Sequence, residues 1–462
     1  MPLRRASNRM EKLNVFIETY GCQMNVNDSE VVASVLASQG HALSPSVEAA
    51  DLVVINTCAI RDNAEVRILG RIGYFRSLRA KEKPGLLIAL IGCMAERLKE
   101  ELLEPAVGVD IVVGPDAYRE LPGLIVQAQQ SGRAINTQLS RTETYDDIEP
   151  LRFGGNGISA FTSIMRGCDN MCTYCIVPYT RGRERSREPG SIVREVLGLQ
   201  AEGYREVTLL GQNVDSYRYR HPEGAHWPFA RLLGEVAAAV PDMRVRFATS
   251  HPKDITEEVL QTMASHENIC RHIHLPFQSG SNAVLKRMRR TYTRELYLEK
   301  VESIRRILPG CAITTDIIAG FCGETDADHR ETISLMEEVV FDGAFMFMYS
   351  ERPGTYAAKR LADDVPESVK NARLQEIIAL QNAASMATNL RDVGREFSVL
   401  VEGPSRKDPE EFCGRTQQNR MVVFPRGHAQ AGDYVRVVVD DTTQTTLRAH
   451  LKEDRSEPLE TV

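Results

Sequence analysis

The 462-residue sequence contains no long hydrophobic run. Its most apolar stretches, such as LLIALIG at residues 86–92, fall far short of the roughly 18 residues that a helix needs to cross a bilayer. Residues 1–16, MPLRRASNRMEKLNVF, include arginines, but no apolar segment of signal-peptide length follows them. These absences argue against membrane insertion and secretion, and we expect a cytoplasmic protein.

The sequence also has no excess of positive charge. Its 56 Lys and Arg residues stand against 63 Asp and Glu residues, which gives a formal net charge of -7. The chain as a whole therefore creates no basic field, and any nucleic acid would have to be held by local patches. The length alone favours about three domains.

Cysteine is the residue whose distribution needs an explanation. In a reducing compartment the ten cysteines are better suited to metal or redox chemistry than to disulfides. The segment GCDNMCTYC, residues 167–175, places Cys168, Cys172 and Cys175 close together with no fourth cysteine and no histidine nearby. A structural zinc site normally has four protein ligands, so the three thiolates better suit an iron-sulfur cluster with one iron left open.

A second group of three cysteines follows the first three predicted strands. Cys22, Cys58 and Cys93 come directly after LNVFIETYG, DLVVINT and GLLIALIG, at separations of 36 and 35 residues. The carboxyl ends of parallel strands form the ligand crevice of an open sheet, so these thiols are expected to converge. The alternative is three unrelated buried cysteines, each filling a small apolar space.

The hydrophobic pattern predicts an α/β protein with three units. We expect an open parallel α/β domain at residues 13–129, a linker at 130–153, a partial (β/α)6 barrel at 154–387, a small β-barrel at 388–453 and a polar tail at 454–462. The strands expected in the partial barrel are FTSIMRG, EVTLLGQN, RVRFATS, HIHLPFQS, AITTDIIAGF and AFMFMYS.

The cluster loop follows the first of these strands, at the end of a barrel where active sites lie. A long helix is expected near residues 367–391. After it, the alternating segments EFSVLVEG, RMVVFP, DYVRVVVDDT and TTLRAHL predict the small β-barrel, a type that often binds nucleic acid.

The C-x3-C-x2-C loop after the first strand of an incomplete barrel resembles that of the radical S-adenosylmethionine superfamily. This resemblance implies a 4Fe-4S cluster on Cys168, Cys172 and Cys175, with S-adenosylmethionine on the open iron as the source of a deoxyadenosyl radical. The cofactor contacts that it implies are Tyr174 for the adenine, Gln212 and Asn213 for the amino end, and Ser250 for the ribose. As alternatives, Gln212 and Asn213 could cap a helix, and His251 beside Ser250 fits a structural hydrogen bond as well as a substrate contact.

The flanks of the first three cysteines make the resemblance narrower. TYGCQMNVNDSE, INTCAIRDNA and LIGCMAER, together with the radical loop and the terminal β-barrel, resemble the methylthiotransferase family from about Leu13 to Leu451. The family implies a second 4Fe-4S cluster on Cys22, Cys58 and Cys93, and a terminal TRAM domain that holds RNA. Cys322 stands where many relatives have proline, and we do not expect it to be a ligand.

The residues after the second cysteine indicate a branch of this family. NTCAIR with Asp62, Asn63 and Ala64 resembles the branch that methylthiolates carbon 2 of N6-isopentenyladenosine at tRNA position 37. The resemblance implies S-adenosylmethionine as both methyl donor and radical source, an electron donor such as flavodoxin or ferredoxin, a sulfur source, and a monomeric enzyme. Alternatives are a methylthiotransferase for threonylcarbamoyladenosine or for a ribosomal protein, and a noncatalytic iron-sulfur sensor that binds RNA.

Local basic runs are the candidate RNA contacts. YTRGRERSR supplies Arg181 and Arg183, with Arg185 and Arg187 behind them, and such a run is either a solvated face or a set of phosphate contacts. KRMRRTYTR, which contains Arg290, has the same two interpretations. The expected contacts in the β-barrel come from GRTQQNR and are Arg415, Asn419 and Arg420.

Overall fold

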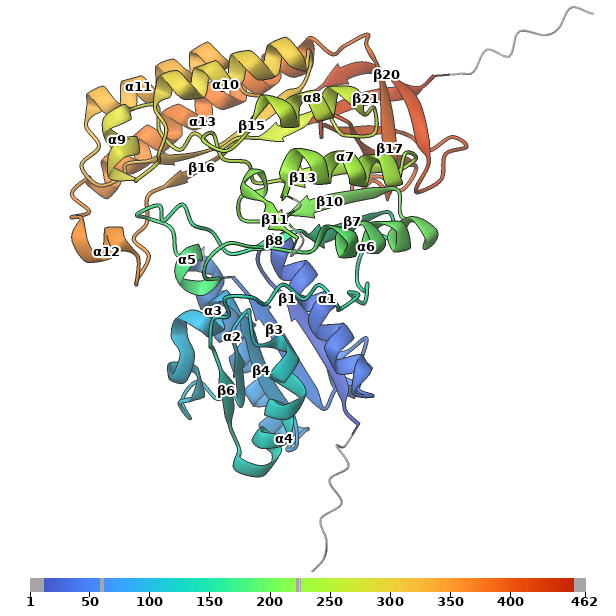
Figure 1. Ribbon diagram of the computed structural model, residues 1–462, viewed down its shortest axis with the longest axis vertical. Coiled ribbons are helices and arrows are strands. Elements are labelled where there is room, and N and C mark those ends of the chain that lie inside the picture. Colours follow the sequence, from blue (N-terminus) through green and yellow to red (C-terminus); the bar gives the residue numbers. More distant parts are fainter. Residues whose placement is uncertain (1–11, 59–61, 222–223, 225, 453–462) are drawn as a thin grey trace, which may run out of the picture.

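The computed structural model describes residues 12–58, 62–221, 224 and 226–452, with the side chains of residues 62–64 excepted. The N-terminal domain lies at the bottom of Figure 1, the central domain lies above it, and the C-terminal β-barrel is at the upper right. The expected α/β class, with an open N-terminal sheet and a closed C-terminal barrel, is confirmed. No helix in the described part of the chain is both long and apolar enough to cross a bilayer.

The N-terminal domain is built on a six-stranded parallel sheet with the order β2-β1-β3-β4-β5-β6. Its strands are β1 (Asn14–Thr19), β2 (Ala42–Leu43), β3 (Leu52–Thr57), β4 (Leu87–Gly92), β5 (Ile111–Val113) and β6 (Ala134–Asn136). The apolar residues of β3 and β4 are buried on both faces because helices cover both. Helices α1 (Gln23–Ser38) and α4 (Leu121–Ser131) pack on one face, and α2 (Asp62–Lys81) and α3 (Cys93–Leu98) pack on the other.

One strand lies inside the segment expected to be a linker. Ala134–Asn136 forms β6 and pairs in parallel with β5, so the sheet continues past residue 129. The short run AIN carries too little periodicity to be recognised as a strand, and the pairing with β5 decides its conformation. The rest of the expected linker, from residue 137, has no helix or strand before β7.

The central domain has six parallel strands in two neighbouring sheets. The sheet β13-β10-β7 and the sheet β14-β15-β16 are joined by a single parallel bridge between Val245 and Ile269. The strands are β7 (Ser159–Ser163), β10 (Glu206–Leu210), β13 (Arg244–Ala248), β14 (His272–His274), β15 (Ala312–Ala319) and β16 (Gly343–Met348). The expected first strand FTSIMRG is interrupted, since β8 (Met165–Arg166) turns away to pair with β9 (Arg185–Ser186).

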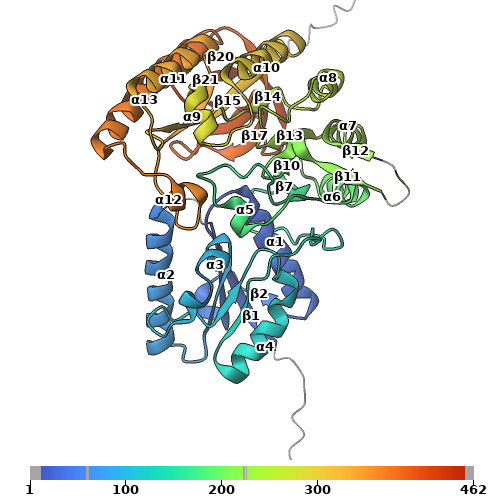
Figure 2. The ribbon, with the colours of Figure 1, turned by 60° about the vertical axis from the view of Figure 1, so that its left-hand side comes forward.

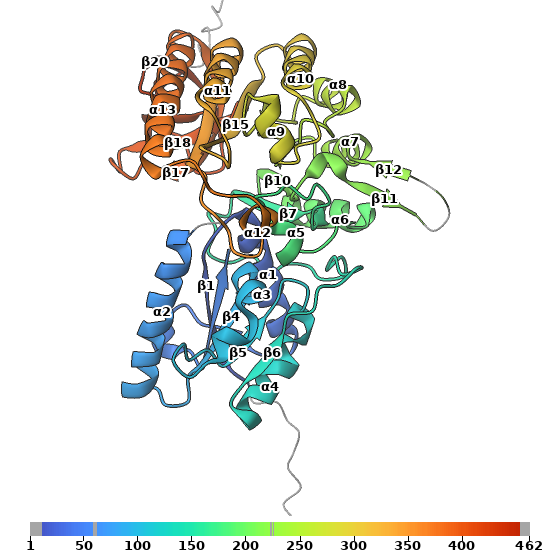
Figure 3. The ribbon, with the colours of Figure 1, turned by 90° about the vertical axis from the view of Figure 1, so that its left-hand side faces the viewer.

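Helices cover the outer side of these strands (Figure 3). They are α6 (Pro189–Ala201), α7 (Phe229–Ala239), α8 (Glu257–Ser265), α9 (Asn282–Arg287), α10 (Arg294–Ile307), α11 (Asp326–Val339) and α13 (Glu367–Leu390). Shorter elements are α5 (Val177–Thr180), α12 (Tyr356–Arg360), the hairpin of β11 (Arg218–Arg220) and β12 (His226–Pro228), and single turns at Val47–Ala49, Lys99–Leu103, Tyr118–Glu120 and Val214–Ser216. Helix α5 lies where the N-terminal and central domains meet (Figure 2).

The C-terminal unit is a closed five-stranded barrel with the order β17-β18-β19-β21-β20. Its strands are β17 (Glu396–Pro404), β18 (Glu411–Thr416), β19 (Met421–Pro425), β20 (Tyr434–Thr442) and β21 (Thr446–Leu451). The sequence pattern predicts four of these and misses β18. The buried positions of β18 are Phe412, Gly414 and Thr416, which give a weak apolar alternation.

Candidate active site

The first cysteine triad lies at one edge of the N-terminal sheet. Cys22 precedes α1, Cys58 follows β3 and Cys93 is the first residue of α3. A hydrogen bond with Cys58 lowers the pKa of Cys22 to about 6, and the charge of Arg181 acts in the same direction. Burial raises the pKa of Cys93, and the charge of Cys22 adds to that rise. The three thiols therefore converge, as the strand-end positions predict.

The backbone between these thiols is tightly constrained. Gly21 has φ +128°, and a Cβ there would lie 2.6 Å from Cys58 Cβ and 2.6 Å from Asn25 Oδ1. Only glycine fits this conformation and this approach. Asn25 donates to Asn56 Oδ1 at 2.9 Å, and Asn56 donates to Ser29 Oγ at 2.9 Å. This buried amide network joins the first turns of α1 to the end of β3, and so holds Cys22 near Cys58.

The second triad is on the loop between β8 and α5. The Cys168 N–H donates to Gly182 O at 3.1 Å, and the Cys175 N–H donates to Cys172 O at 3.0 Å. A Cβ on Gly167, where φ is +79°, would lie 2.0 Å from Arg183 O, so the returning chain requires glycine. Burial raises the pKa of both Cys168 and Cys175 to about 12.

Arg290 contacts this second triad. Its guanidinium donates to Cys172 Sγ at 3.3 Å, to Tyr292 Oη at 3.1 Å and to Pro276 O at 3.2 Å. Arg290 belongs to a basic run for which the sequence allows phosphate contacts, but in the structure its guanidinium lies against Cys172 of the cluster loop. Tyr174 packs edge-on against Phe321, with ring centroids 6.2 Å apart.

The segments that carry the two triads meet at the domain junction. Ile176, directly after Cys175, packs against Cys93, and α5 lies against α3. Arg181 follows α5, and its Nε donates to Cys93 Sγ at 3.2 Å. Arg181 is one of the predicted RNA contacts, but in this structure its side chain is 3% exposed and bound to Asp28.

The expected cofactor residues lie at the carboxyl ends of β10 and β13. Asn213 donates through Nδ2 to Asp254 at 2.7 Å. Among the described residues, several buried polar atoms here have no hydrogen-bond partner; they are Gln212 Oε1, Asn213 Oδ1, Asp215 Oδ1, Ser250 Oγ and His251 Nε2. Burial raises the pKa of Asp215 to about 7 and lowers that of His251 to about 2. Because buried polar groups are rarely left unpaired, this group of atoms suits a polar ligand.

The remaining RNA candidates differ in exposure. Arg183 is 69% exposed and makes an ion pair with Asp169 at 3.3 Å. Arg415 pairs with Glu402 at 3.2 Å and also donates to Asn419 O. Both Arg415 and Asn419 are half-buried.

Arg420 has a different role from the one expected. Its guanidinium bonds Asp342 of the central domain at 2.7 Å and also Asp392 and Asn389 near the end of α13. The side chain of Arg420, which was predicted to contact RNA, therefore joins the barrel to the central domain.

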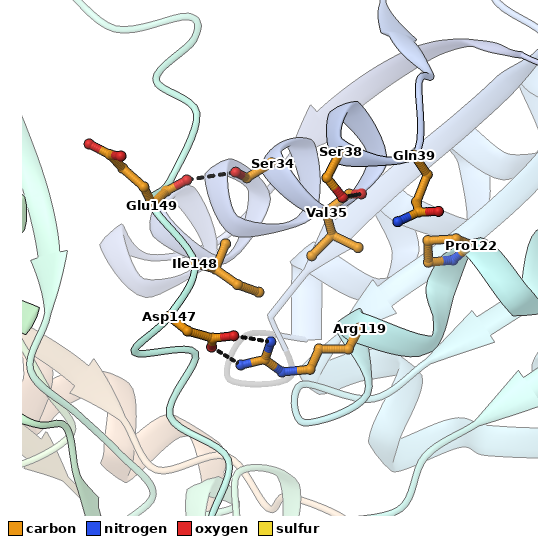
Figure 4. A pocket seen from close by; sticks show the side chains of 9 residues that line it. All are labelled: Ser34, Val35, Ser38, Gln39, Arg119, Pro122, Asp147, Ile148 and Glu149. Carbon is orange, nitrogen blue, oxygen red and sulfur yellow. Dashed lines mark hydrogen bonds and ion pairs between the residues drawn. The ribbon is translucent and has the colours of Figure 1, made fainter.

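One surface hollow lies away from the cysteines (Figure 4). It is lined by the far end of α1, by Pro122 and by residues 147–149, and an ion pair between Arg119 and Asp147 crosses it. Ser34 is 12 residues along α1 from Cys22, which places it about 18 Å away. No thiol or imidazole lines this hollow, so we do not assign it to the chemistry.

Comparison with known families divides the chain as the fold does. Residues 14–114 match the Uncharacterized protein family UPF0004, residues 162–336 match the Radical SAM superfamily, and residues 390–452 match the TRAM domain.

Curated relatives match along nearly the whole length. The tRNA-2-methylthio-N(6)-dimethylallyladenosine synthase of Phocaeicola vulgatus is 55% identical over 96% of this chain and 97% of its own. The enzymes of the same name from Bacteroides thetaiotaomicron and Porphyromonas gingivalis are 56% and 54% identical, over 94% and 96% of this chain and 95% and 96% of their own. The chain belongs to the radical S-adenosylmethionine methylthiotransferase family. Its cofactors are S-adenosylmethionine and two 4Fe-4S clusters.

Solved structures of this fold have diverged far in sequence. The radical S-adenosylmethionine methyltransferase TsrM of Kitasatospora setae, solved with cobalamin and a [4Fe-4S] cluster, aligns over 75% of this chain and 77% of its own with a TM-score of 0.55 and 14% identity. The cobalamin-dependent radical enzyme OxsB aligns over 80% of this chain and 56% of its own with a TM-score of 0.54 and 13% identity. At such identities the likeness concerns the fold alone.

The donor atoms of this methylthiotransferase fit its clusters. The thiols of each triad influence one another electrostatically. Cys58, Cys93 and Cys172 are buried, Cys168 and Cys175 are half-buried, and Cys22 is exposed. Within the described residues, no three Cys, His, Asp or Glu side chains surround a point where one metal ion could sit. Binding to iron deprotonates thiols, which offsets the raised pKa of Cys168 and Cys175.

Part of the INTCAIRDNA motif lies outside the described residues. This part consists of Ala59, Ile60 and Arg61 and the side chains of Asp62, Asn63 and Ala64.

Some residues near the first triad gave little signal in the sequence. Asp28 and Arg166 were not singled out, although they form a buried ion pair of 2.8 Å beside Cys93 and Arg181. The available signal for Arg166 is an arginine inside the otherwise apolar run FTSIMRG. Cys322 is buried among Phe321, Tyr349 and Met288, away from both triads.

Proposed function

We propose that this methylthiotransferase adds a methylthio group to carbon 2 of N6-isopentenyladenosine at tRNA position 37. The observation that carries the proposal is the meeting of the two cysteine triads across Ile176 and Arg181. The names of the relatives and the TRAM barrel support tRNA as the substrate. The proposal includes cytoplasmic location, a monomeric enzyme, an external sulfur source and a one-electron donor such as flavodoxin or ferredoxin.

Each triad has a separate task in this proposal. Cys168, Cys172 and Cys175 hold the cluster that cleaves S-adenosylmethionine, and Cys22, Cys58 and Cys93 hold the auxiliary cluster. When bound, the first cluster and S-adenosylmethionine would supply the radical that removes the hydrogen from carbon 2 of adenine, and the auxiliary cluster would supply the sulfur that takes the place of this hydrogen. Arg290 offsets the negative charge of the thiolates near Cys172.

The chain's own side chains then orient the cofactor. Tyr174 forms an apolar wall next to the cluster loop, and its edge contact with Phe321 fixes its ring. In this proposal the amino and ribose ends of S-adenosylmethionine are the hydrogen-bond partners of three unpaired polar side chains, Gln212, Asn213 and Ser250.

The inner face of β14, β15 and β16 suits a prenylated purine. Ala344 and Met346 pack outward against the core, so the alternate residues Phe345 and Phe347 face the interior of the partial barrel. They are 58% and 42% exposed, which leaves two phenyl rings available to an apolar group and a base.

Polar groups lie beside these rings. His274 lies edge-on to Phe345, with ring centroids 5.8 Å apart, and its Nε2 is 3.4 Å from Asp316 Oδ1. A dimethylallyl adenine offers an apolar tail for the rings and polar base edges for the imidazole and the carboxylate.

The C-terminal barrel is bound to strand β13 of the central domain. Arg246 donates to Thr416 O at 2.8 Å and Arg244 donates to Arg415 O at 2.6 Å. These contacts leave the side chains of Arg415 and Asn419 as RNA candidates, together with Arg183 near the cluster loop.

The test is anaerobic reconstitution, a count of iron and sulfide, and incubation with isopentenylated tRNA and S-adenosylmethionine. Nucleoside analysis should find 2-methylthio-N6-isopentenyladenosine. Replacing Cys168, Cys172 and Cys175 by Ala should abolish deoxyadenosine release, whereas replacing Cys22, Cys58 and Cys93 should preserve that release and stop sulfur insertion.

The rival functions predict other products. A noncatalytic sensor would bind clusters without cleaving S-adenosylmethionine, and a threonylcarbamoyladenosine or ribosomal-protein enzyme would modify that substrate in preference to isopentenylated tRNA. If the variant without Cys22, Cys58 and Cys93 still thiolated RNA, the division of tasks between the triads would be wrong.

A further inference from the structure

Arg181 reaches from the central domain into the first cysteine triad. Its NH2 donates to Asp28 at 2.7 Å and its Nε donates to Cys93 Sγ at 3.2 Å. The side chain is 3% exposed, and its third nitrogen, NH1, has no hydrogen-bond partner among the described residues. A buried guanidinium with an unused donor beside a metal-binding thiol indicates a further anionic partner.

The charges around Arg181 do not balance. Asp28 also accepts from Arg166 at 2.8 Å, and Asp116 accepts from Arg185 at 2.8 Å. Three buried guanidinium groups therefore share two buried carboxylates, and the remaining positive charge faces the thiols of the first triad. An uncompensated buried charge is costly, so an anion at the sulfur end of Arg181 would complete the network.

A second residue of the central domain lies against the same triad. Ile176 packs against Cys93, the thiol to which Arg181 donates. The first triad is therefore contacted by the central domain through an apolar side chain as well as through the guanidinium. The auxiliary centre is completed only where the two domains meet.

We propose that Arg181 is a positioning residue of the auxiliary centre, which neutralises the cysteine-bound cluster and holds a small sulfur anion, hydrosulfide or methanethiolate, against it. This inference rests on the proposed function, which requires sulfur to be presented next to the radical site. The cation acts through Cys93 Sγ and through NH1, and Asp28 fixes its orientation. A hydrogen bond to a charged group corresponds to about ten- to hundredfold in affinity.

The test uses the full chain with Cys168, Cys172 and Cys175 replaced by Ala, so that only the auxiliary cluster remains. Into this parent we introduce Arg181→Met, Arg181→Lys or Asp28→Asn. The matched control is Arg194→Met, because Arg194 is on α6 and its side chain is 73% exposed. Iron and sulfide per chain, the midpoint potential, and the binding of hydrosulfide or methanethiolate followed by electron paramagnetic resonance are measured for each.

We expect Arg181→Met to keep the cluster, since the three cysteines remain. Its affinity for the sulfur anion should fall at least about tenfold, and its potential should become more negative, because an added electron is no longer stabilised by the cation. Arg181→Lys should recover part of both losses, and Arg194→Met should match the parent.

The Asp28→Asn variant separates an electrostatic role from a structural one. It keeps Arg181 and removes a negative charge, so the potential should move in the positive direction and the anion should bind more tightly. A structural role predicts that both variants move the same way. That result, or parent-like values in Arg181→Met, would overturn the proposal; if Arg181→Met does not fold, Arg181→Lys and Asp28→Asn still decide.

Failure of the proposed function is recognised separately. These measurements involve no tRNA turnover, so they stand whatever the substrate is. If the parent assembles no auxiliary cluster, the proposed function fails before any variant is compared.

Discussion

Replacing Phe345 by Ala tests where the substrate base lies. Phe345 is 58% exposed and faces the interior of the partial barrel, so its removal takes away little packed core. Its edge contact with His274 is the one ring contact that it makes among the described residues. Truncation should therefore leave folding nearly unchanged and weaken the binding of a stacked base.

The expected size follows from base stacking. Stacking of a base on an aromatic side chain contributes about 1–3 kcal/mol, as measured by alanine substitution. That range corresponds to a rise in KM of roughly 5- to 150-fold for an isopentenylated anticodon stem-loop. Phe347→Ala should act in the same direction, since Phe347 is 42% exposed on the same face.

The assay measures initial rates of methylthio formation against RNA concentration, together with the thermal unfolding midpoint of each variant. Leu197→Ala is the matched control, because Leu197 is 42% exposed on the outer helix α6. If Phe345→Ala and Phe347→Ala both keep the parental KM, the base does not lie along the inner face of β16. A lower unfolding midpoint with unchanged KM would likewise refute the assignment.

Three further substitutions have distinct expected outcomes. Arg420→Ala should lower the free energy of unfolding by about 3 kcal/mol, since it removes the ion-pair partner of Asp342 and leaves Asp392 with Arg395 alone. Thermal melts check this, and loss of RNA affinity at an unchanged midpoint would contradict it. Arg183→Ala should leave the unfolding midpoint unchanged, because its side chain is 69% exposed. If Arg183 contacts a phosphate, the substitution should weaken RNA binding and reduce the slope of log K against log salt concentration by about one. An unchanged slope would remove Arg183 from the RNA site. Burial raises the pKa of Asp215 to about 7 in the folded chain, above its value of 3.8 when unfolded. Between about pH 4 and pH 7 the unfolded chain therefore releases this proton while the folded chain still binds it. The folded state loses stability as the pH rises through this range. Asp215→Asn should therefore stabilise the chain at pH 8, by up to about 4 kcal/mol, and have little effect at pH 4; melts at both pH values test this, and an equal effect at the two would count against it.

The position of the clusters relative to the domains has a consequence for assembly. Arg181 and Ile176 belong to the central domain, yet both contact Cys93 of the N-terminal domain. The surroundings of the auxiliary centre are therefore formed by domain docking, and changes at the junction are expected to alter sulfur chemistry without touching any cysteine.

The sequence by itself predicted the two groups of three cysteines and determined the order of the domains. Cys22, Cys58 and Cys93 could be assigned because strand ends in a parallel sheet share one edge, which is a property of local pattern and topology. The loop of Cys168, Cys172 and Cys175 could be assigned because its ligand spacing is contained in a single short segment. The element boundaries were less certain where apolar signal was weak, as in β6 and β18.

Only the tertiary structure decided what the arginines do. Arg181 and Arg183 stand two positions apart in one charged run, yet the first is buried against Asp28 and Cys93 and the second is mostly in solvent. Arg420 likewise stands in a polar turn, but it binds carboxylates of the central domain. Burial and partner choice depend on surfaces contributed by distant segments, so a local pattern of charge carries no information about them.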